Sequence, residues 1–316
     1  MQIRGFRPGD GAALVEAWRR ALPLDPMSYP RFRDLVLLDA NFDPDGLRIA
    51  LDGDRLMGAA YAVRRRVAMV GGDLEPGTGW LPFFFVTPDA RGVGVGRAVV
   101  RSALDWLRNQ GAREVFFASY TPNYVLPGLD AEAYPEADAL LRDLGFERRS
   151  EAAAMDRSLV GYRLPDELRA RVDDLVAGGH RFGTPTGDDL VEVVRLAGED
   201  FSPDWARAIR SAVVAGLPLD RIVGAWDPDG TLAGWAMHAA YENVLERFGP
   251  FGVRPDRRGT GLGRILLHLT LERMRAAGAH SAWFLWTGER SPAGQLYRST
   301  GFAVTRRFAV LRAELT

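Results

Sequence analysis

Cysteine is absent from this chain of 316 residues, and histidine occurs only four times. Without cysteine the protein has no disulfide, no thiolate zinc site, no iron–sulfur cluster and no cysteine nucleophile. Neither sign of charge prevails, because 40 Lys+Arg residues face 41 Asp+Glu residues, for a formal charge of -1. This balance disfavours nucleic acid as a partner, since phosphate lattices are bound through clustered basic side chains.

Long apolar runs are also missing. No stretch approaches the ~20 apolar residues of a membrane span, and the opening sequence MQIRGFRP lacks the apolar core of a signal peptide. We therefore expect a cytoplasmic protein with no membrane partner. The histidines show no metal-ligand spacing with acids, so no metal site is expected. The length corresponds to two domains of roughly 150 residues each.

One segment of the chain occurs twice. Residues 84–97 (FFVTPDARGVGVGR) and 251–264 (FGVRPDRRGTGLGR) are identical at 9 of 14 positions after a shift of 167. Similar features follow both segments in the same order, down to the Gly-Phe pairs at 145–146 and 301–302. No shorter period recurs, so the pattern indicates a duplicated domain and not a stacked array.

The surroundings of both segments predict the same local structure. Each begins in an apolar run typical of a buried strand and continues into helical spacing of apolar residues that ends at Gly111 or Gly278. A second apolar strand follows, at 115–118 or 282–286. Strand, glycine loop, helix and strand together predict a parallel strand pair with a right-handed crossover.

The rest of the sequence predicts the same further elements in both copies. Each copy opens with an amphipathic helix followed by a hairpin, and closes with a short helix; a further helix beginning at Pro165 lies between the copies. The opening helices are expected at 10–21 and 188–197. The run Arg64-Arg65-Arg66 indicates a solvated hairpin end. We expect domains at 1–160 and 180–316, joined by a linker at 161–179.

The glycine segments are suited to binding an anion. Glycines at alternate positions before a helix allow positive φ, and they direct consecutive N–H groups and the positive end of the helix dipole at a ligand. A tight turn with solvated arginines would explain the same residues, but two copies in the same context favour phosphate binding. The triphosphate loop is excluded by its missing lysine. The dinucleotide fingerprint is excluded by its missing third glycine and acid.

The remaining pattern, Arg-x-x-Gly-x-Gly after a strand that ends in valine, resembles the acetyl-coenzyme A loop of the GNAT superfamily of N-acetyltransferases. A second family signature, Ala-x-x-Leu-Tyr-x-x-x-Gly-Phe, is present at 293–302. The resemblance is strong in the second copy and partial in the first. It implies an α/β (α+β) fold of two tandem domains, each with a mixed, mostly antiparallel central sheet flanked by helices.

The resemblance also implies how acetyl-coenzyme A, the expected co-substrate, would bind. Its pantetheine arm would pair with the kinked strand before each loop, and the loop amides would hold its pyrophosphate. The residues expected to bind it in the second copy are Phe251, Gly252, Val253, Arg258, Gly259, Thr260, Gly261, Leu262, Gly263 and Arg264. Those expected in the first copy are Phe84, Phe85, Val86, Arg91, Gly92, Val93, Gly94, Val95, Gly96 and Arg97.

The resemblance places a general acid at Tyr297, where a phenol would protonate the leaving thiolate. A packing role for the same tyrosine remains the alternative. The first copy has Leu141 at this position, so we expect it to be catalytically degenerate, unless Tyr120, Tyr124 or Tyr134 substitutes. Glu246 is the candidate general base, with Glu242 as an alternative. His238 is interpreted as a structural histidine.

Two functional hypotheses follow. The first is an N-acetyltransferase that acts by direct attack of a small-molecule primary amine, with the second copy catalytic. The second is a protein that binds acetyl-coenzyme A for regulation or assembly and does not turn it over. The expected partner is a small-molecule amine. The protein itself is expected to be a monomer or a homodimer. Residues that could contact a cationic acceptor are Asp200, Asp204, Trp205 and Asp220.

Overall fold

The computed structural model describes residues 1–315 and divides into two compact units. One unit comprises Met1–Ala68, Asp73–Ala152 and Arg306–Thr316; the other comprises Met69–Gly72 and Ala153–Thr305. Each unit contains most of one sequence copy together with the last strand of the other copy. The domain boundaries at 161 and 180 describe the copies along the chain and stay a prediction.

The first unit is built on one sheet with the strand order β1-β2-β3-β4-β5-β12. The bounds are β1 Gln2–Gly5, β2 Leu47–Asp52, β3 Arg55–Val63, β4 Thr78–Val86, β5 Glu114–Phe117 and β12 Ala303–Glu314. Neighbouring strands are antiparallel except β4 and β5, which are parallel. The parallel pair predicted around the first glycine segment is therefore present.

Side chains of this sheet face two cores, and on β4 a register shift opposite Tyr61–Val63 interrupts the strict alternation of a strand. On β4, Leu81 and Phe84 belong to the core under α3, whereas Phe83 and Phe85 pack with α1. The helices are α1 Asp10–Ala21, α2 Tyr29–Phe32, α3 Val95–Asn109 and α4 Pro135–Asp143. The prediction of a helix at 10–21 is confirmed.

The second unit has the corresponding elements. One sheet has the order β10-β9-β8-β7, with β7 Arg181–Gly183, β8 Ile222–Trp226, β9 Leu232–His238 and β10 Phe248–Val253. Strand β11 (Ser281–Thr287) pairs antiparallel with β6 (Glu147–Ser158). The helices are α5 Asp166–Ala177, α6 Asp189–Glu199, α7 Pro203–Val214, α8 Leu262–Ala276 and α9 Pro292–Ser299.

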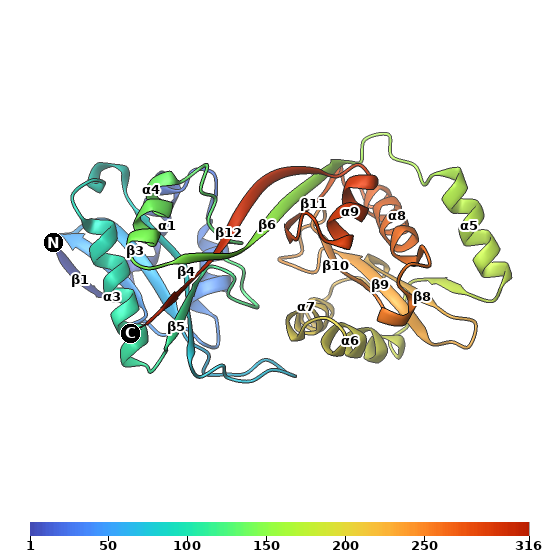
Figure 1. Ribbon diagram of the computed structural model, residues 1–316, viewed down its shortest axis with the longest axis horizontal. Helices are drawn as coiled ribbons and strands as arrows, with labels where there is room; N and C mark the ends of the chain where they lie inside the picture. Colours follow the sequence, from blue (N-terminus) through green and yellow to red (C-terminus); the bar gives the residue numbers. More distant parts are fainter. Residues whose placement is uncertain (316) are drawn as a thin grey trace. The chain divides into compact units, whose positions relative to one another are not determined.

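The last strand of each copy is exchanged (Figure 1). Strand β6 follows α4 of the first copy but pairs with β11 of the second, and β12 follows α9 of the second copy but pairs with β5 of the first. Leu311 lies opposite Phe117, and Phe284 lies opposite Met155. Each unit therefore needs one strand from the other copy to complete its sheet.

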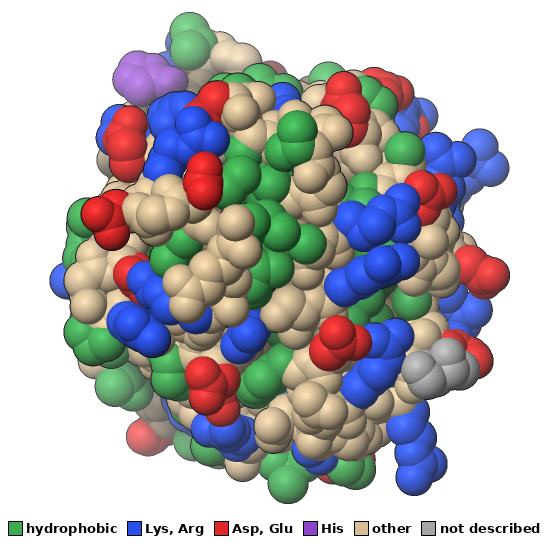
Figure 2. Space-filling view, turned by 90° about the vertical axis from the view of Figure 1, so that its left-hand side faces the viewer, with side chains coloured by type: hydrophobic (Ala, Val, Ile, Leu, Met, Phe, Trp, Pro, Cys, Tyr) green, Lys and Arg blue, Asp and Glu red, His purple; other side chains and the backbone are tan. Residues whose placement is uncertain are grey.

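The surface reflects the balanced charge. On the face in Figure 2, arginines and acidic side chains are interspersed around a narrow strip of apolar side chains. Among residues 1–315, no helix combines the length and apolar character that crossing a membrane requires.

Candidate active site

In the first unit, the parallel strands β4 and β5 separate after a short paired stretch. Pairing runs from Thr78/Glu114 to Leu81/Phe117, and the Ala118 N–H donates to the Leu81 carbonyl at 2.9 Å. Positive φ angles of 56° and 49° at Ala118 and Ser119 then direct the chain away. Strand β4 continues to Val86 without a β5 partner, so Phe84, Phe85 and Val86 lie along an opening between the two strands.

The first glycine loop connects this opening to α3. Gly92 and Gly94 have φ of 79° and 86°, a region that disfavours any side chain. Gly94 caps α3 without a side-chain hydrogen bond, so the first amides of the helix face outward unpaired by a cap. At Gly96 a Cβ would lie 3.1 Å from Leu140, so this glycine permits close packing of α3 against α4. The loop has the geometry of an anion site.

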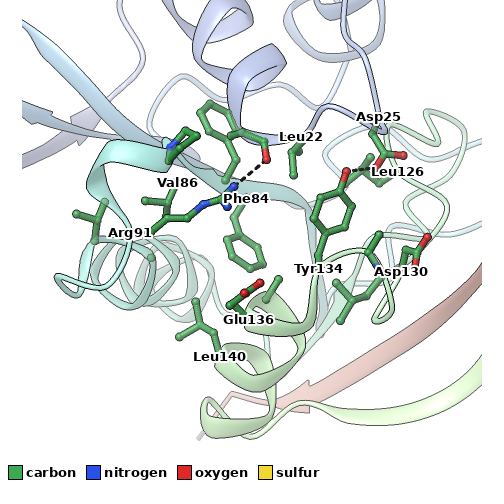
Figure 3. A pocket seen from close by; sticks show the side chains of 18 of the residues that line it. Leu22, Asp25, Phe84, Val86, Arg91, Leu126, Asp130, Tyr134, Glu136 and Leu140 are labelled. Carbon is green, nitrogen blue, oxygen red and sulfur yellow. Dashed lines mark hydrogen bonds between the residues drawn. The ribbon is translucent and has the colours of Figure 1, made fainter.

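A pocket of about 660 Å³ extends from this loop along the strand opening (Figure 3). It is lined by nine of the ten residues that the sequence predicts for cofactor binding in the first copy: Phe84, Phe85, Val86, Arg91, Gly92, Gly94, Val95, Gly96 and Arg97. The tenth, Val93, is 72% exposed and is not among the lining residues. Arg91 donates to the Ala21 carbonyl at 3.0 Å and so fixes the loop to the end of α1.

The other end of the pocket is polar. The Tyr134 hydroxyl donates to Asp25 Oδ2 at 2.7 Å, and Arg306 donates to both oxygens of Asp25 at 2.8 and 3.1 Å. Arg306 Nε also donates to Asp130 Oδ2 at 2.8 Å. Sequence reasoning missed Asp25, Asp130 and Arg306, because Arg306 reaches the pocket only through the exchanged strand β12.

The second unit has the same separation of strands. Arg247 and Trp283 form a single parallel bridge, in which the Trp283 N–H donates to the Glu246 carbonyl at 2.9 Å. Beyond it, β10 pairs only with β9, and its register shifts between Phe248 and Phe251. Gly252 lets the Phe201 ring lie against this strand, because a Cβ would be 2.5 Å from the ring.

The second glycine loop repeats the first. Gly259 and Gly261 have φ of 78° and 91°, and Gly261 caps α8 without a side-chain hydrogen bond. Arg258 Nε donates to the Val253 carbonyl at 3.3 Å, which ties the loop to the end of β10. Thr260 donates to the Arg257 carbonyl at 2.7 Å.

A buried carboxylate supports this second loop. Asp227, 5% exposed, accepts from Arg254 at 3.2 Å and from Arg257 at 2.8 Å. These arginines flank the short turn that leads into the loop. Asp227 lies in the β8–β9 hairpin, where the sequence indicated only a turn, so its role was not foreseen. The other predicted loop residues, Leu262, Gly263 and Arg264, begin α8, and Arg264 pairs with Glu167 at 3.1 Å.

Tyr297 lies in an aromatic cluster at the strand opening of the second unit. Its ring centroid is 4.4 Å from Phe284, 6.0 Å from Phe248 and 6.1 Å from Phe251. Burial raises the pKa of its phenol well above the ordinary value, so the hydroxyl stays protonated at neutral pH. No hydrogen bond of this hydroxyl occurs within residues 1–315. Leu141, at the corresponding position of the first unit, is fully buried.

The other candidate proton carriers differ in their surroundings. The side chain of Glu246 is half-buried beside the bridge between β10 and β11, whereas Glu242 pairs with Arg247 at 3.0 Å. His238 is buried and donates from Nδ1 to the Leu245 carbonyl at 2.9 Å; burial lowers its pKa to about 4. This environment is that of a neutral structural histidine.

The residues expected near an acceptor are not equivalent. Asp204 is 1% exposed in the packing of α7, whereas Asp200 and Asp220 are exposed and Trp205 is half-buried. Among residues 1–315, no three His, Cys, Asp or Glu side chains come together as a metal site would require.

Comparison with known families identifies the family to which the chain belongs. The sequence profile of the Acetyltransferase (GNAT) family matches residues 12–125 and 190–302, one match in each copy. The chain belongs to the GNAT family. This GNAT protein is an acyltransferase with two tandem family domains, and the resemblance and the fold class expected from the sequence are confirmed.

The similar curated proteins are mycothiol acetyltransferases. The one from Geodermatophilus obscurus is 34% identical over 122 residues, which is 36% of this chain and only 38% of that enzyme. Those from Gordonia bronchialis and Mycolicibacterium vanbaalenii are 28% and 27% identical and align over 80% and 91% of this chain, covering 80% and 94% of theirs.

Solved structures share the fold. The glucosamine N-acetyltransferase region of a fungal multi-domain GH3 β-N-acetylglucosaminidase has a TM-score of 0.81 at 19% identity, over 98% of this chain and 38% of that chain. A tandem GNAT protein from the clavulanic acid biosynthesis pathway has a TM-score of 0.67 at 17% identity, over 100% of this chain and 98% of that chain.

The GNAT co-substrate, acetyl-coenzyme A, fits the residues present. Both glycine loops offer uncapped helix amides beside positive-φ glycines, and both lead from a strand edge that its neighbour leaves open. The helix amides of each loop suit a pyrophosphate, and the open strand edge suits an extended pantetheine arm.

Proposed function

We propose that this GNAT protein transfers an acetyl group from acetyl-coenzyme A to a primary amine of a small molecule, and that its second unit is catalytic. The amine nitrogen attacks the thioester carbon directly, the carbon–sulfur bond breaks, and no covalent enzyme intermediate forms. The absence of cysteine is compatible with this route. The observation that carries the proposal is the Tyr297 hydroxyl, which is protonated, makes no hydrogen bond within residues 1–315, and belongs to a ring beside Phe248 and Phe251 on the open strand β10.

The proposed residues have separate tasks. Phe251, Gly252 and Val253 would pair with the pantetheine arm, and a backbone amide there would stabilise the oxyanion of the tetrahedral intermediate. The loop from Arg258 to Arg264 would hold the pyrophosphate. Tyr297 would give its proton to the departing thiolate, because its buried phenol is protonated at neutral pH.

Glu246 is the proposed general base. Its carbonyl accepts the hydrogen bond that marks the point where β10 and β11 separate, and within residues 1–315 its half-buried side chain forms no ion pair. A carboxylate at this point would remove a proton from an incoming ammonium group, through water, before attack.

A non-catalytic role in binding acetyl-coenzyme A is the second candidate. It is favoured by the packing of Tyr297, whose ring makes four close aromatic contacts, with Phe248, Phe251, Phe284 and Phe302. A tyrosine held in this way would also serve as a packing residue. The two candidates differ in one measurable quantity, the turnover of acetyl-coenzyme A.

The test is thiol release from acetyl-coenzyme A in the presence of a panel of primary amines: glucosamine, spermidine, an aminoglycoside, an alanyl dipeptide and, from the relatives' name, the amine precursor of mycothiol. The printed sequence contains no lysine, so no lysine ε-amine of the protein competes as an acceptor. Calorimetric titration with acetyl-coenzyme A counts the binding sites in parallel. Binding without release for every amine would favour the second candidate, and no binding would reject both.

Tyr297→Phe tests the acid itself. General acid catalysis contributes about 10²–10⁴-fold, so we expect the turnover number of the second unit to fall by at least about 10²-fold while acetyl-coenzyme A affinity changes little. Tyr162→Phe is the matched control, because that hydroxyl is bonded to His268, away from the strand opening. Equal turnover of both variants would assign Tyr297 to packing.

A further inference from the structure

At the polar end of the first-unit pocket, four side chains form one hydrogen-bonded cluster. Arg306 binds Asp25 through two nitrogens and Asp130 through a third, and Asp25 accepts from the Tyr134 hydroxyl. The two carboxylate side chains are 13% and 10% exposed. A network this enclosed holds the Tyr134 phenol in one orientation at the pocket wall (Figure 3).

Tyr134 stands on the pocket side of α4. It immediately precedes this helix and lies seven residues before Leu141, the position at which the second copy has Tyr297. Tyr134 is the N-cap of α4, so about two turns of helix, or about 10 Å, separate the two positions along the helix. Leu141 is fully buried in the core, whereas Tyr134 lines the pocket together with the glycine loop.

The other tyrosines of the first unit are placed differently. Tyr61 is fully buried, and Tyr120 is buried with its hydroxyl bonded to Asn41 at 2.8 Å. Tyr29 and Tyr124 are not among the residues that line the pocket. Of the three tyrosines that the sequence offered as substitutes for the missing acid, Tyr134 is thus the one that lines the pocket.

We propose that the first unit contains a second acyl-transfer site, in which the Tyr134 hydroxyl breaks its hydrogen bond to Asp25 and protonates the leaving thiolate, with Asp25 the positioning residue that holds the phenol at the pocket wall before this step. This site lies outside the second-unit function proposed above. In its reaction an amine nitrogen bonds to the thioester carbon, the carbon–sulfur bond breaks, and sulfur takes the phenolic proton. The surplus proton of the amine passes to water, from which the tyrosinate is reprotonated.

The distribution of charge along the pocket indicates the class of acceptor. Arg20, Arg91 and Arg97 line the end with the glycine loop, where phosphates would bind. At the other end the lining carboxylates are Asp25 and Asp130, which share the single positive charge of Arg306, and Glu136 lines the pocket between the two ends (Figure 3). The excess negative charge at this end, one beyond what Arg306 compensates, together with Glu136 favours an acceptor that is cationic in solution, such as a polyamine or an amino sugar.

The exchanged strand makes this site dependent on both copies. Without Arg306, the carboxylates of Asp25 and Asp130 would lie partly buried without a counter-charge, a costly arrangement. β12 therefore supplies the first-unit pocket with the charge that lets its two acids lie beside Tyr134.

The experiment uses the full chain in a Tyr297→Phe background, which removes the acid proposed for the second unit. Transfer from acetyl-coenzyme A to spermidine and to glucosamine is measured with and without the additional Tyr134→Phe change. We expect the residual turnover number to fall at least tenfold and acetyl-coenzyme A affinity to stay within about twofold, because a general acid acts on the chemical step. Tyr29→Phe, the control in the same background, should leave residual transfer unchanged.

A second variant tests whether the residual transfer depends on the glycine loop of the first unit. Gly94→Val in the Tyr297→Phe background should remove residual transfer through loss of acetyl-coenzyme A binding, since Gly94 has φ of 86°. Two results would overturn the second site. One is residual transfer that is unchanged by Tyr134→Phe, and the other is a Tyr297→Phe variant that shows no residual transfer at all. The second-unit function would still stand if wild-type transfer depends on Tyr297. A wild-type chain without transfer overturns both.

Discussion

Replacement of Asp227 by asparagine tests whether a buried carboxylate holds the second glycine loop in shape. Asp227 is 5% exposed and accepts from Arg254 at 3.2 Å and from Arg257 at 2.8 Å. Both arginines donate to the same atom, Oδ2, so an asparagine oxygen placed there keeps both hydrogen bonds but removes the buried negative charge that faces the two guanidinium groups. A hydrogen bond to a charged partner contributes about 1.5–3 kcal/mol. Arg254 keeps Asp256 as a partner, so we expect a loss of about 2 kcal/mol.

This loss has two consequences that can be measured. For a unit of this size, about 2 kcal/mol lowers the midpoint of thermal unfolding by about 4–8 °C. If about half of it falls on the loop conformation that binds pyrophosphate, affinity for acetyl-coenzyme A at the second unit falls about fivefold. Calorimetric unfolding measures the first effect, and calorimetric titration measures the second.

The control for Asp227 lies in the same hairpin. Asp229 is exposed and accepts from the Thr231 N–H at 2.9 Å, a bond that the oxygen of an asparagine side chain would preserve. Asp229→Asn should therefore leave both midpoint and affinity unchanged. If Asp227→Asn and Asp229→Asn behave alike in both assays, the ion pairs do not support the loop, and the reasoning is refuted.

Two further outcomes are expected. Arg306→Met should destabilise the first unit by about 2–3 kcal/mol in urea unfolding, since it leaves Asp25 and Asp130 partly buried without their guanidinium partner. Arg101→Met, at an exposed position of α3 in the same unit, should not. Buried His238 has a pKa of about 4, below the ordinary 6.5, so the unfolded chain binds more protons between these values. The free energy of unfolding should therefore fall as pH drops from 6.5 toward 4, and it should fall less steeply in His238→Asn. Equal slopes of unfolding free energy against pH in the two proteins would contradict this.

Local patterns predicted much of the fold. The helix at 10–21 and the parallel pair around the first glycine segment follow from apolar periodicity and from residues that end helices. The glycine loops were equally readable, because Gly92, Gly94, Gly259 and Gly261 occupy the positive φ that their spacing indicates. The family assignment depends on these same segments.

Features set by distant partners were not predictable. The pattern of an apolar strand does not specify which neighbour it joins, so the exchange of β6 and β12 leaves no local signal. The interpretation of Arg64-Arg65-Arg66 as a solvated end was wrong for Arg65. It is 4% exposed, donates to the Thr121 carbonyl at 2.8 Å, and stacks over Trp80. Its partners lie too far along the chain for a charge run to reveal them.

Strand exchange also sets the order in which the two units can complete their folding during synthesis. The ribosome makes nearly all of the first unit early, yet β5 gains its neighbour β12 only when residues 311–314 emerge. Until then the edge of β5 is exposed, and an unpaired edge invites association with other nascent chains. The unit that is translated first is therefore completed last, and a ribosome that stalls within the second copy leaves both units unfinished.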